Sequence, residues 1–259
     1  MTGRETAYNK KLKDLVKKVG KLEDHEVMRV MKLLEQARTE VAAGIAVTEW
    51  QAHHIPQLKE AVSNALEGFR QQYNRGQAEA LINMWNAGID MVDHPLQSVG
   101  VRPLVAMEIN REALEIMQGY SADLINGLSA DALKKINSEI TLGIMGQKSP
   151  FEVMQTIGRN FDDKSVFTGI SRRAETITRT EMSKVHSMAR EARMHAVADG
   201  GTDPEMKWQK KWISSGKAEP RPHHAGLNGV IIDMDEDFLG YIPYPHAPGL
   251  AAEEVINCG

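Results

Sequence analysis

Residues 171–199 read SRRAETITRTEMSKVHSMAREARMHAVAD, and this stretch decides the fold class. It contains no proline or glycine, and one stripe of side chains recurs at steps of three or four residues. That spacing places the stripe on a single helix face. Its members are Ile177, Glu181, Val185, Met188 and Ala192. We therefore predict one long helix whose apolar face packs against other helices.

The residues before this stretch carry similar helical spacing. Apolar residues at three- and four-residue steps predict helices over 7–44, 56–92, 109–127 and 130–145. Gly20 and Gly44 are expected helix stops, because glycine is common just beyond a helix C-terminus. A connection is expected from His94 to Pro103, since the residue before a proline disfavours helix.

Two short motifs predict helix starts. Thr48-Glu-Trp-Gln51 has the pattern of a capping box, in which two side chains satisfy backbone N–H groups reciprocally. Ser149-Pro-Phe-Glu152 places serine at the N-cap, proline at the first helical position and glutamate at the third. Gly158 is the expected end of the short helix that follows.

The pattern changes after Asp199. Residues 206–213 and 229–233 are typical of short strands, and loops separate and follow them. We therefore predict an α+β protein that is predominantly α-helical, with long N-terminal helices followed by a small C-terminal α+β lobe. We expect residues 1–128 to form a helical partner-binding region and residues 129–259 to form a second domain.

Composition and charge exclude some classes of protein. Of the 259 residues, 42% are hydrophobic and 25% are charged, which is ordinary for a globular protein. The net charge of −4 gives no overall basic field to attract nucleic acid. A basic run near the N-terminus faces only Glu5 and Asp14; it comprises Arg4, Lys10, Lys11, Lys13, Lys17, Lys18 and Lys21. We interpret this run as a solvated helix face, with an anionic partner such as packaged DNA as the alternative.

Cysteine content and hydropathy suggest where the protein resides. A single cysteine, Cys258, excludes an intramolecular disulfide framework and fits a reducing compartment. The N-terminus carries charges where a signal peptide needs an apolar core. No apolar run approaches the ~18 residues that span a bilayer, so no membrane partner is expected. We expect a protein made and kept in the cytoplasm, or assembled there.

Glu181 stands out because it lies in line with the apolar stripe, where an unpaired carboxylate would be costly. Arg179 points elsewhere, so a buried Glu181 needs a partner from outside its helix. Arg221 is the predicted partner, since Pro220 and Pro222 hold it rigidly. His224 is the competing partner. A third possibility is that Glu181 lies at the edge of the stripe and reaches solvent.

The histidines and tryptophans of the C-terminal region could bind a ligand or build the lobe. His223 and His224 would project to opposite sides of an extended backbone. Zinc needs ~4 nitrogen or sulfur donors; the weak candidates are His223, His224, His246 and Cys258. Their spacing matches no standard zinc finger, so we favour hydrogen-bonded histidines and predict no cofactor. Trp208 and Trp212 are interpreted as apolar anchors that pack the lobe onto the helices.

A catalytic role is the weaker hypothesis. Arg179, Glu181 and the two histidines could form a transferase or hydrolase site. The chain has no glycine-rich phosphate loop, no nucleophile elbow and no spaced acidic metal cluster. His223-His224-x-x-x-Asn228 is faintly similar to a ββα-metal nuclease motif. From Asp203 onward, however, nine acidic residues face five basic ones, and such a lobe would repel DNA.

An ordered series of motifs over residues 130–258 resembles the phage Mu protein F-like minor head protein family, also described as phage head morphogenesis proteins. In chain order its members are Ile140, Leu142 and Gly143, the cap at 149–152, Ala174, Ile177, Arg179, Thr180, Glu181, Trp212, the loop 221–229, the segment 243–245 and Asn257-Cys258. The order and spacing carry the resemblance, because each piece alone is weak.

Two motifs resemble the family most closely. Arg179-Thr-Glu181 is similar to its Arg-Thr-Glu signature. The loop 221–229 resembles Arg-x-x-His-x-x-x-(Asp/Asn)-Gly, which aligns His224 with the family histidine. Two positions depart from the pattern: Glu219 replaces the usual aspartate before the loop, and Gly259 follows Asn-Cys where the family continues Asn-Cys-Arg-Cys. The expected structural signature comprises Arg179, Glu181, Trp212, Arg221, His224, Asn228, Gly229, Asn257 and Cys258.

The resemblance implies a minor capsid protein found in the virion, inside the head at the portal vertex. Its implied partners are the portal protein and capsid or scaffold proteins, and its implied role is head assembly with DNA packaging or ejection. Residues 129–259 would be the Mu F-like domain, and no catalytic activity is implied. The alternative is an effector or enzyme carried in the capsid, such as an ADP-ribosyltransferase-like protein or a nuclease.

Overall fold

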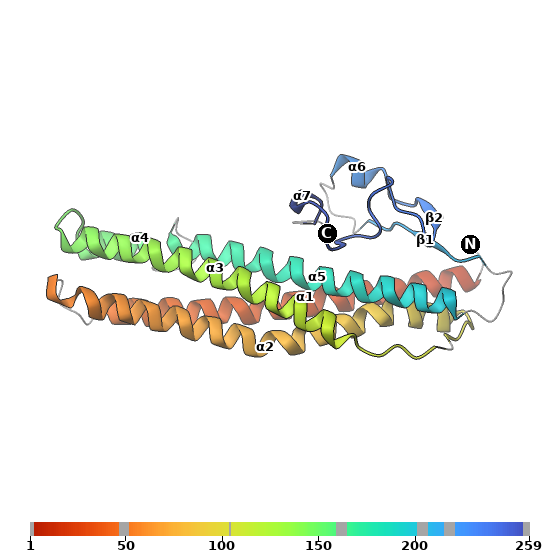
Figure 1. The fold of residues 1–259 in the computed structure, drawn as a ribbon, viewed down its shortest axis with the longest axis horizontal. Helices are drawn as coiled ribbons and strands as arrows, with labels where there is room; N and C mark the ends of the chain where they lie inside the picture. The colour runs from red at the N-terminus through yellow and green to blue at the C-terminus, as the bar shows by residue number, and fades with distance from the viewer. Residues whose placement is uncertain are drawn as a thin grey trace. The chain divides into compact units, whose positions relative to one another are not determined.

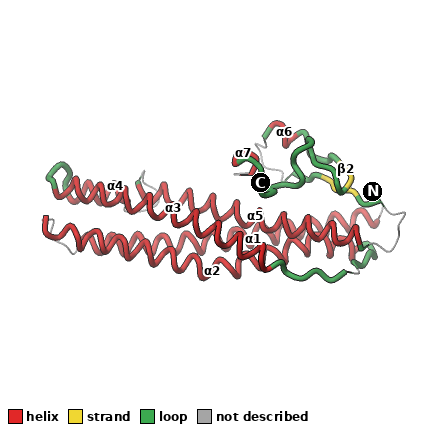
Figure 2. Tube along the Cα trace, in the orientation of Figure 1, coloured by secondary structure: helices red, strands yellow, loops and turns green. Residues whose placement is uncertain are grey.

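A computed structural model describes residues 3–46, 52–103, 105–158, 165–200, 207–214 and 221–255. Helices make up most of it (Figures 1 and 2). They are α1 (Gly3–Ala46), the 3₁₀ turn η1 (Ala52–His54), α2 (Ile55–Ser98), α3 (Arg111–Ile144), α4 (Pro150–Ile157), α5 (Val166–Asp199), α6 (Pro222–Ala225) and α7 (Ala252–Val255). Two short strands, β1 (Gln209–Lys211) and β2 (Ile231–Asp233), follow α5. The predicted α+β class with long N-terminal helices is confirmed. None of the helices described here has a stretch both long and apolar enough to span a membrane.

Two predicted helix interruptions are absent. α1 runs through Gly20, and the helices predicted over 109–127 and 130–145 are one continuous α3. A glycine inside a helix costs only about 1 kcal/mol. Buried side chains continue on either side of it, Leu15 and Val27 in α1 and Ile125 and Leu128 in α3. Each buried apolar side chain contributes about 1.5–3 kcal/mol, so burial outweighs the glycine.

The predicted connection from His94 is also wrong at its start, because α2 continues to Ser98 with Pro95 inside it. Pro95 is buried in the last turn, next to the buried Met91 and Val92. The Ser98 hydroxyl donates a hydrogen bond to the Pro95 carbonyl over 2.6 Å. Tertiary packing therefore holds the final turn in helical form despite the proline.

The cap at Ser149 forms as predicted. The Glu152 backbone N–H donates to Ser149 Oγ over 3.2 Å, and the Ser149 N–H donates to Glu152 Oε2 over 2.7 Å. Gly158 ends α4 with φ +116°, and its N–H donates to the Met154 carbonyl. The capping box predicted at 48–51 lies outside the described residues.

The chain forms two compact units. We call Glu23–Ala80 with Glu115–Arg179 the bundle unit, and Met1–Leu22, Leu81–Leu114 and Thr180–Gly259 the lobe-bearing unit. Each takes part of α1, α2, α3 and α5. The domain boundary predicted at residues 128 and 129 remains a prediction.

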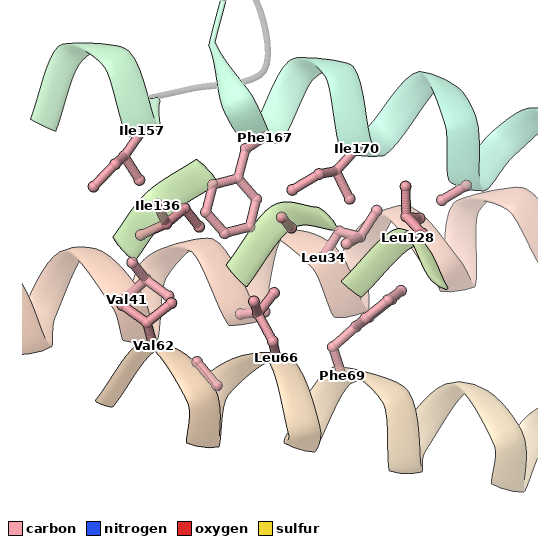
Figure 3. Packing of buried hydrophobic residues seen from close by; sticks show 14 of the residues in the cluster. Leu34, Val41, Val62, Leu66, Phe69, Leu128, Ile136, Ile157, Phe167 and Ile170 are labelled. Carbon is pink, nitrogen blue, oxygen red and sulfur yellow. The ribbon is translucent and has the colours of Figure 1, made fainter. Parts of the chain in front are cut away.

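The bundle unit is organised around one apolar core. Figure 3 shows side chains from α1, α2, α3, α4 and α5 meeting there. Those labelled are Leu34, Val41, Val62, Leu66, Phe69, Leu128, Ile136, Ile157, Phe167 and Ile170. Tyr73 adds a buried polar contact, with its hydroxyl 2.9 Å from Ser121 Oγ. The apolar helix faces that the sequence periodicity predicts are therefore buried against one another.

In the lobe-bearing unit, α2 and α5 approach closely. A Cβ atom built on Gly88 would lie 2.5 Å from the His186 carbonyl oxygen and 2.8 Å from Ala189 Cβ. Arg193 on α5 binds both carboxylate oxygens of Asp93 on α2, over 2.6 and 3.0 Å. Its Nη1 also donates to the Val105 carbonyl over 2.6 Å. This bidentate pair joins the end of α2 to α5.

The part of the lobe-bearing unit that follows α5, residues 207–214 and 221–255, is called the C-terminal lobe. β1 and β2 pair antiparallel, with Lys210 opposite Ile232. Trp212 is buried in a small core of its own; the core comprises Trp212, Leu227, Phe238 and Ile242. The prediction that the tryptophans pack the lobe onto the helices is wrong for Trp212, because the two-stranded sheet needs an anchor of its own.

Candidate functional site

The loop 221–229 folds into α6 and a turn. Arg221 occupies the N-cap position with Pro222 at the first helical position, and the Ala225 N–H donates to the Arg221 carbonyl over 2.8 Å. Proline suits this position because its φ is preset and no N–H is needed there. His223 and His224 therefore lie on a helical turn. The predicted extended backbone, with the two rings on opposite sides, is wrong.

Trp212, Asn228 and Gly229 build the scaffold of the lobe. The Trp212 N–H donates to the Val230 carbonyl, and the Gly229 N–H donates to the Trp212 carbonyl, each over 2.9 Å. Gly229 has φ +87°, a left-handed conformation that glycine adopts without a steric cost. Asn228 Oδ1 accepts the Ser214 N–H over 3.2 Å. These contacts extend the pairing of β1 and β2.

His223 and His224 both bind Glu254, which lies on α7. The His224 Nε2 lies 2.7 Å from Glu254 Oε2, and the His223 Nε2 lies 3.1 Å from the same oxygen. His224 is buried against Trp212, with ring centroids 5.5 Å apart, whereas the His223 side chain is 43% exposed. The Arg221 Nη1 donates to the Glu254 carbonyl over 3.5 Å. One carboxylate therefore ties α7 to two imidazoles on α6.

The surroundings of this cluster lower the pKa values of both Glu254 and His224. Hydrogen bonds from His223 and His224 hold the pKa of Glu254 below its usual range, with the His223 bond the larger cause. Burial lowers the pKa of His224, although its hydrogen bond to Glu254 opposes the shift. Both pKa shifts favour a neutral His224 beside an ionised Glu254, with the ring N–H donating to the carboxylate.

Glu181 is buried, with a relative exposure of 2%, so the proposed edge position is wrong. Its partner is Lys184 on the same helix, whose Nζ lies 2.8 Å from Glu181 Oε1. The predicted partner, Arg221, and the alternative, His224, are both wrong. Burial raises the pKa of Glu181, and the Lys184 bond opposes the shift. Residues three apart on a helix are neighbours, so the sequence did carry this signal.

The residues considered for catalysis have separate partners. Arg179 Nη1 lies 3.0 Å from Asp24, and its Nε lies 3.0 Å from Glu175. The Arg179 side chain is 40% exposed, which is typical of a surface ion pair. Glu181 is engaged by Lys184, and the two histidines are engaged by Glu254. Within the described residues these side chains form no joint catalytic arrangement.

The candidate zinc ligands that the structure describes do not all lie together. His223 and His224 come together with Glu254, and their ligand atoms lie within 4.8 Å of one another. His246 is not part of this cluster; it is buried, and with Arg190 it contributes to lowering the pKa of the buried His186. Asn257 and Cys258 lie outside the described residues. Glu254 was not predicted, because the acidic pair 253–254 has the pattern of a solvated helix start.

A buried ion pair joins the lobe to α5. Lys210 on β1 lies 3.1 Å from Glu191 on α5, and both side chains are at most 10% exposed. Lys210 also donates to the Pro243 carbonyl over 2.9 Å. This contact gives the segment 243–245 a structural role, since its backbone completes the bonding of a buried ammonium group.

Comparison with known proteins identifies one family. Residues 134–258 match the model of a family described as Phage Mu protein F like protein. Neither a search of curated proteins nor a search of solved structures gave a match. The matched range includes α4, α5, both strands, the histidine pair and Glu254.

Proposed function

Because residues 134–258 belong to the Phage Mu protein F like family of head morphogenesis proteins, we propose that this chain is a minor capsid protein that docks at the portal vertex of a tailed phage. It would support head assembly and the packaging or ejection of DNA. The family match carries this proposal. The C-terminal lobe supports it, because the motif residues Trp212, Asn228 and Gly229 build a hydrogen-bonded scaffold.

We place portal docking on the helical region 1–128. Ile116 and Tyr120 lie one turn apart on α3 and are 65% and 50% exposed. Their side chains share a helix face, since residues four apart are neighbours. An exposed aliphatic and aromatic pair is typical of the anchors at protein interfaces. The partner would be a portal subunit that presents an apolar groove.

Packaged DNA is a second proposed partner. The basic residues of the N-terminal run are exposed, as expected for a solvated face; they are Arg4, Lys10, Lys11, Lys13, Lys17, Lys18 and Lys21. Lys18 is paired with Asp90 over 3.0 Å. The remaining cations can approach phosphate groups. Replacing Lys10, Lys11, Lys13 and Lys17 with Gln should leave folding intact, because surface changes usually cost within ~0.5 kcal/mol. DNA retention at low salt should fall.

Quantitative mass spectrometry of purified virions tests the main proposal. The protein should be present far below the stoichiometry of the major shell protein, and it should co-purify with portal protein. Ile116→Lys combined with Tyr120→Lys should weaken that association. A matched control is Met145→Lys with Phe151→Lys, two similarly exposed apolar residues outside 1–128. Absence from virions, or abundance equal to the shell protein, contradicts the proposal.

The alternative function is an effector or enzyme carried in the capsid. Incubating the purified full chain with labelled NAD, and separately with plasmid DNA, tests it directly. ADP-ribose transfer or DNA cleavage that survives repurification would favour the alternative over a purely structural role.

A further inference from the structure

The ligand atoms of His223, His224 and Glu254 lie close enough together to be compared with a metal site. Two imidazole Nε2 atoms and a carboxylate oxygen lie within 4.8 Å of one another, and the two nitrogens lie 2.7 and 3.1 Å from that oxygen. A zinc ion binds such atoms at about 2.0–2.2 Å, which places neighbouring ligand atoms roughly 3–3.5 Å apart. The two nitrogen–oxygen distances are therefore close to the spacing of ligand atoms around a zinc ion.

We propose that His223, His224 and Glu254 bind a divalent zinc-type metal ion that joins α6 to α7. This site is independent of the proposed capsid role. Imidazole nitrogens favour zinc and other late first-row metals over magnesium and calcium, which take oxygen ligands.

The position of the cluster gives the metal a structural purpose. His224 and Glu254 are 30 residues apart in the sequence, and they connect two helices of four residues each. Besides the Lys210–Glu191 ion pair with α5, the lobe is held by strands of three residues and a small apolar core. Parts of a fold with a small apolar core of their own commonly use a metal or disulfide staple. The metal would close the loop between α6 and α7.

The two histidines have different surroundings, and the difference suits a metal site. His224 is buried and packs on Trp212, which fixes its ring. His223 is 43% exposed and gives the ion a route from solvent. Three protein ligands leave a fourth position of a tetrahedral site open, and we assign it to water.

Zinc binding can be measured on the untagged full chain after treatment with a chelator. Zn²⁺ is titrated in competition with a chromophoric chelator, and Co²⁺ is used as a visible spectroscopic probe. We expect one ion per chain, cobalt bands typical of a tetrahedral site, and an unfolding temperature that rises by roughly 5–10 °C at a hundredfold excess of zinc over its Kd.

Three variants separate metal binding from folding. His223→Gln removes an exposed ligand, and Glu254→Gln keeps a hydrogen-bond acceptor while removing the carboxylate charge. Both should weaken zinc binding more than about 100-fold. His195→Gln is the matched control, because His195 is 40% exposed and its Nε2 lies 3.4 Å from Glu191. Near-ultraviolet circular dichroism of the metal-free chains checks that each variant is folded.

The outcomes are decisive in both directions. Tight binding that His223→Gln and Glu254→Gln abolish, and that His195→Gln retains, supports the site. The proposal is overturned if folded His223→Gln binds zinc as tightly as the parent chain, or if the parent binds no ion above the level of that variant. The cluster is then a hydrogen-bonded group alone. Neither result depends on the association with portal protein.

Discussion

Replacing Gly88 with alanine adds one methyl group where α2 and α5 approach closely within the lobe-bearing unit. The new Cβ would lie 2.5 Å from the His186 carbonyl oxygen, 2.8 Å from Ala189 Cβ and 3.0 Å from the Arg190 nitrogen. Two of these atoms belong to backbone, so relief requires the helices to separate. Overpacking of this kind costs about 1–3 kcal/mol. The higher helix propensity of alanine offsets up to about 1 kcal/mol of this cost.

We therefore expect Gly88→Ala to lower the free energy of unfolding by about 1–2 kcal/mol. The matched control is Gly68→Ala on the same helix, where a Cβ would meet no atom within 4 Å. That variant should gain up to about 1 kcal/mol.

Urea unfolding followed by far-ultraviolet circular dichroism measures both changes as shifts of the midpoint at constant slope. The two variants should shift in opposite directions. Equal stability of the two variants, or a Gly88→Ala variant more stable than the parent, would refute the close helix contact.

Two further predictions concern buried ionisable side chains. In double-mutant cycles measured by urea unfolding, Glu181→Gln should couple with Lys184→Met by about 1–3 kcal/mol, whereas Arg221→Met should add to it within about 0.5 kcal/mol. Coupling to Arg221 alone would restore the partner first expected from the sequence. Burial lowers the pKa of His186 to about 3, and Arg190 and His246 contribute. The unfolded pKa is about 6.5, so this histidine stabilises the fold above that pH, and the contribution, of the order of 5 kcal/mol, is lost as the pH falls toward 3. His186→Gln should flatten the pH dependence of unfolding between those values, while the exposed His195→Gln should not; equal slopes would contradict the buried neutral state.

Local interactions were predictable from the sequence. The capping box at Ser149 and Glu152 forms because its donors and acceptors are three residues apart, so no distant contact is needed. The strands and the long helix containing Glu181 follow from side-chain periodicity. The ordered motifs over residues 130–258 indicated the family that the comparison found at 134–258.

Errors arose where tertiary contacts outweigh local preference. Gly20 and Pro95 weaken a helix locally, but burial of neighbouring side chains continues it through both positions. The partner of Glu181 was predictable in principle, since Lys184 lies one turn away.

Only the tertiary structure decided the composition of the histidine cluster. Glu254 is 30 residues from His224, and nothing in its local sequence distinguishes it from a solvated acid at a helix start. His246 shares the residue type but lies outside the cluster, beside His186. Periodicity and caps encode interactions within a few residues, so the sequence by itself determined the long helices in outline, the two strands and the resemblance to the family. The path of the chain between α6 and α7 brings distant ligands together, and that path depends on the packing of the Trp212 core.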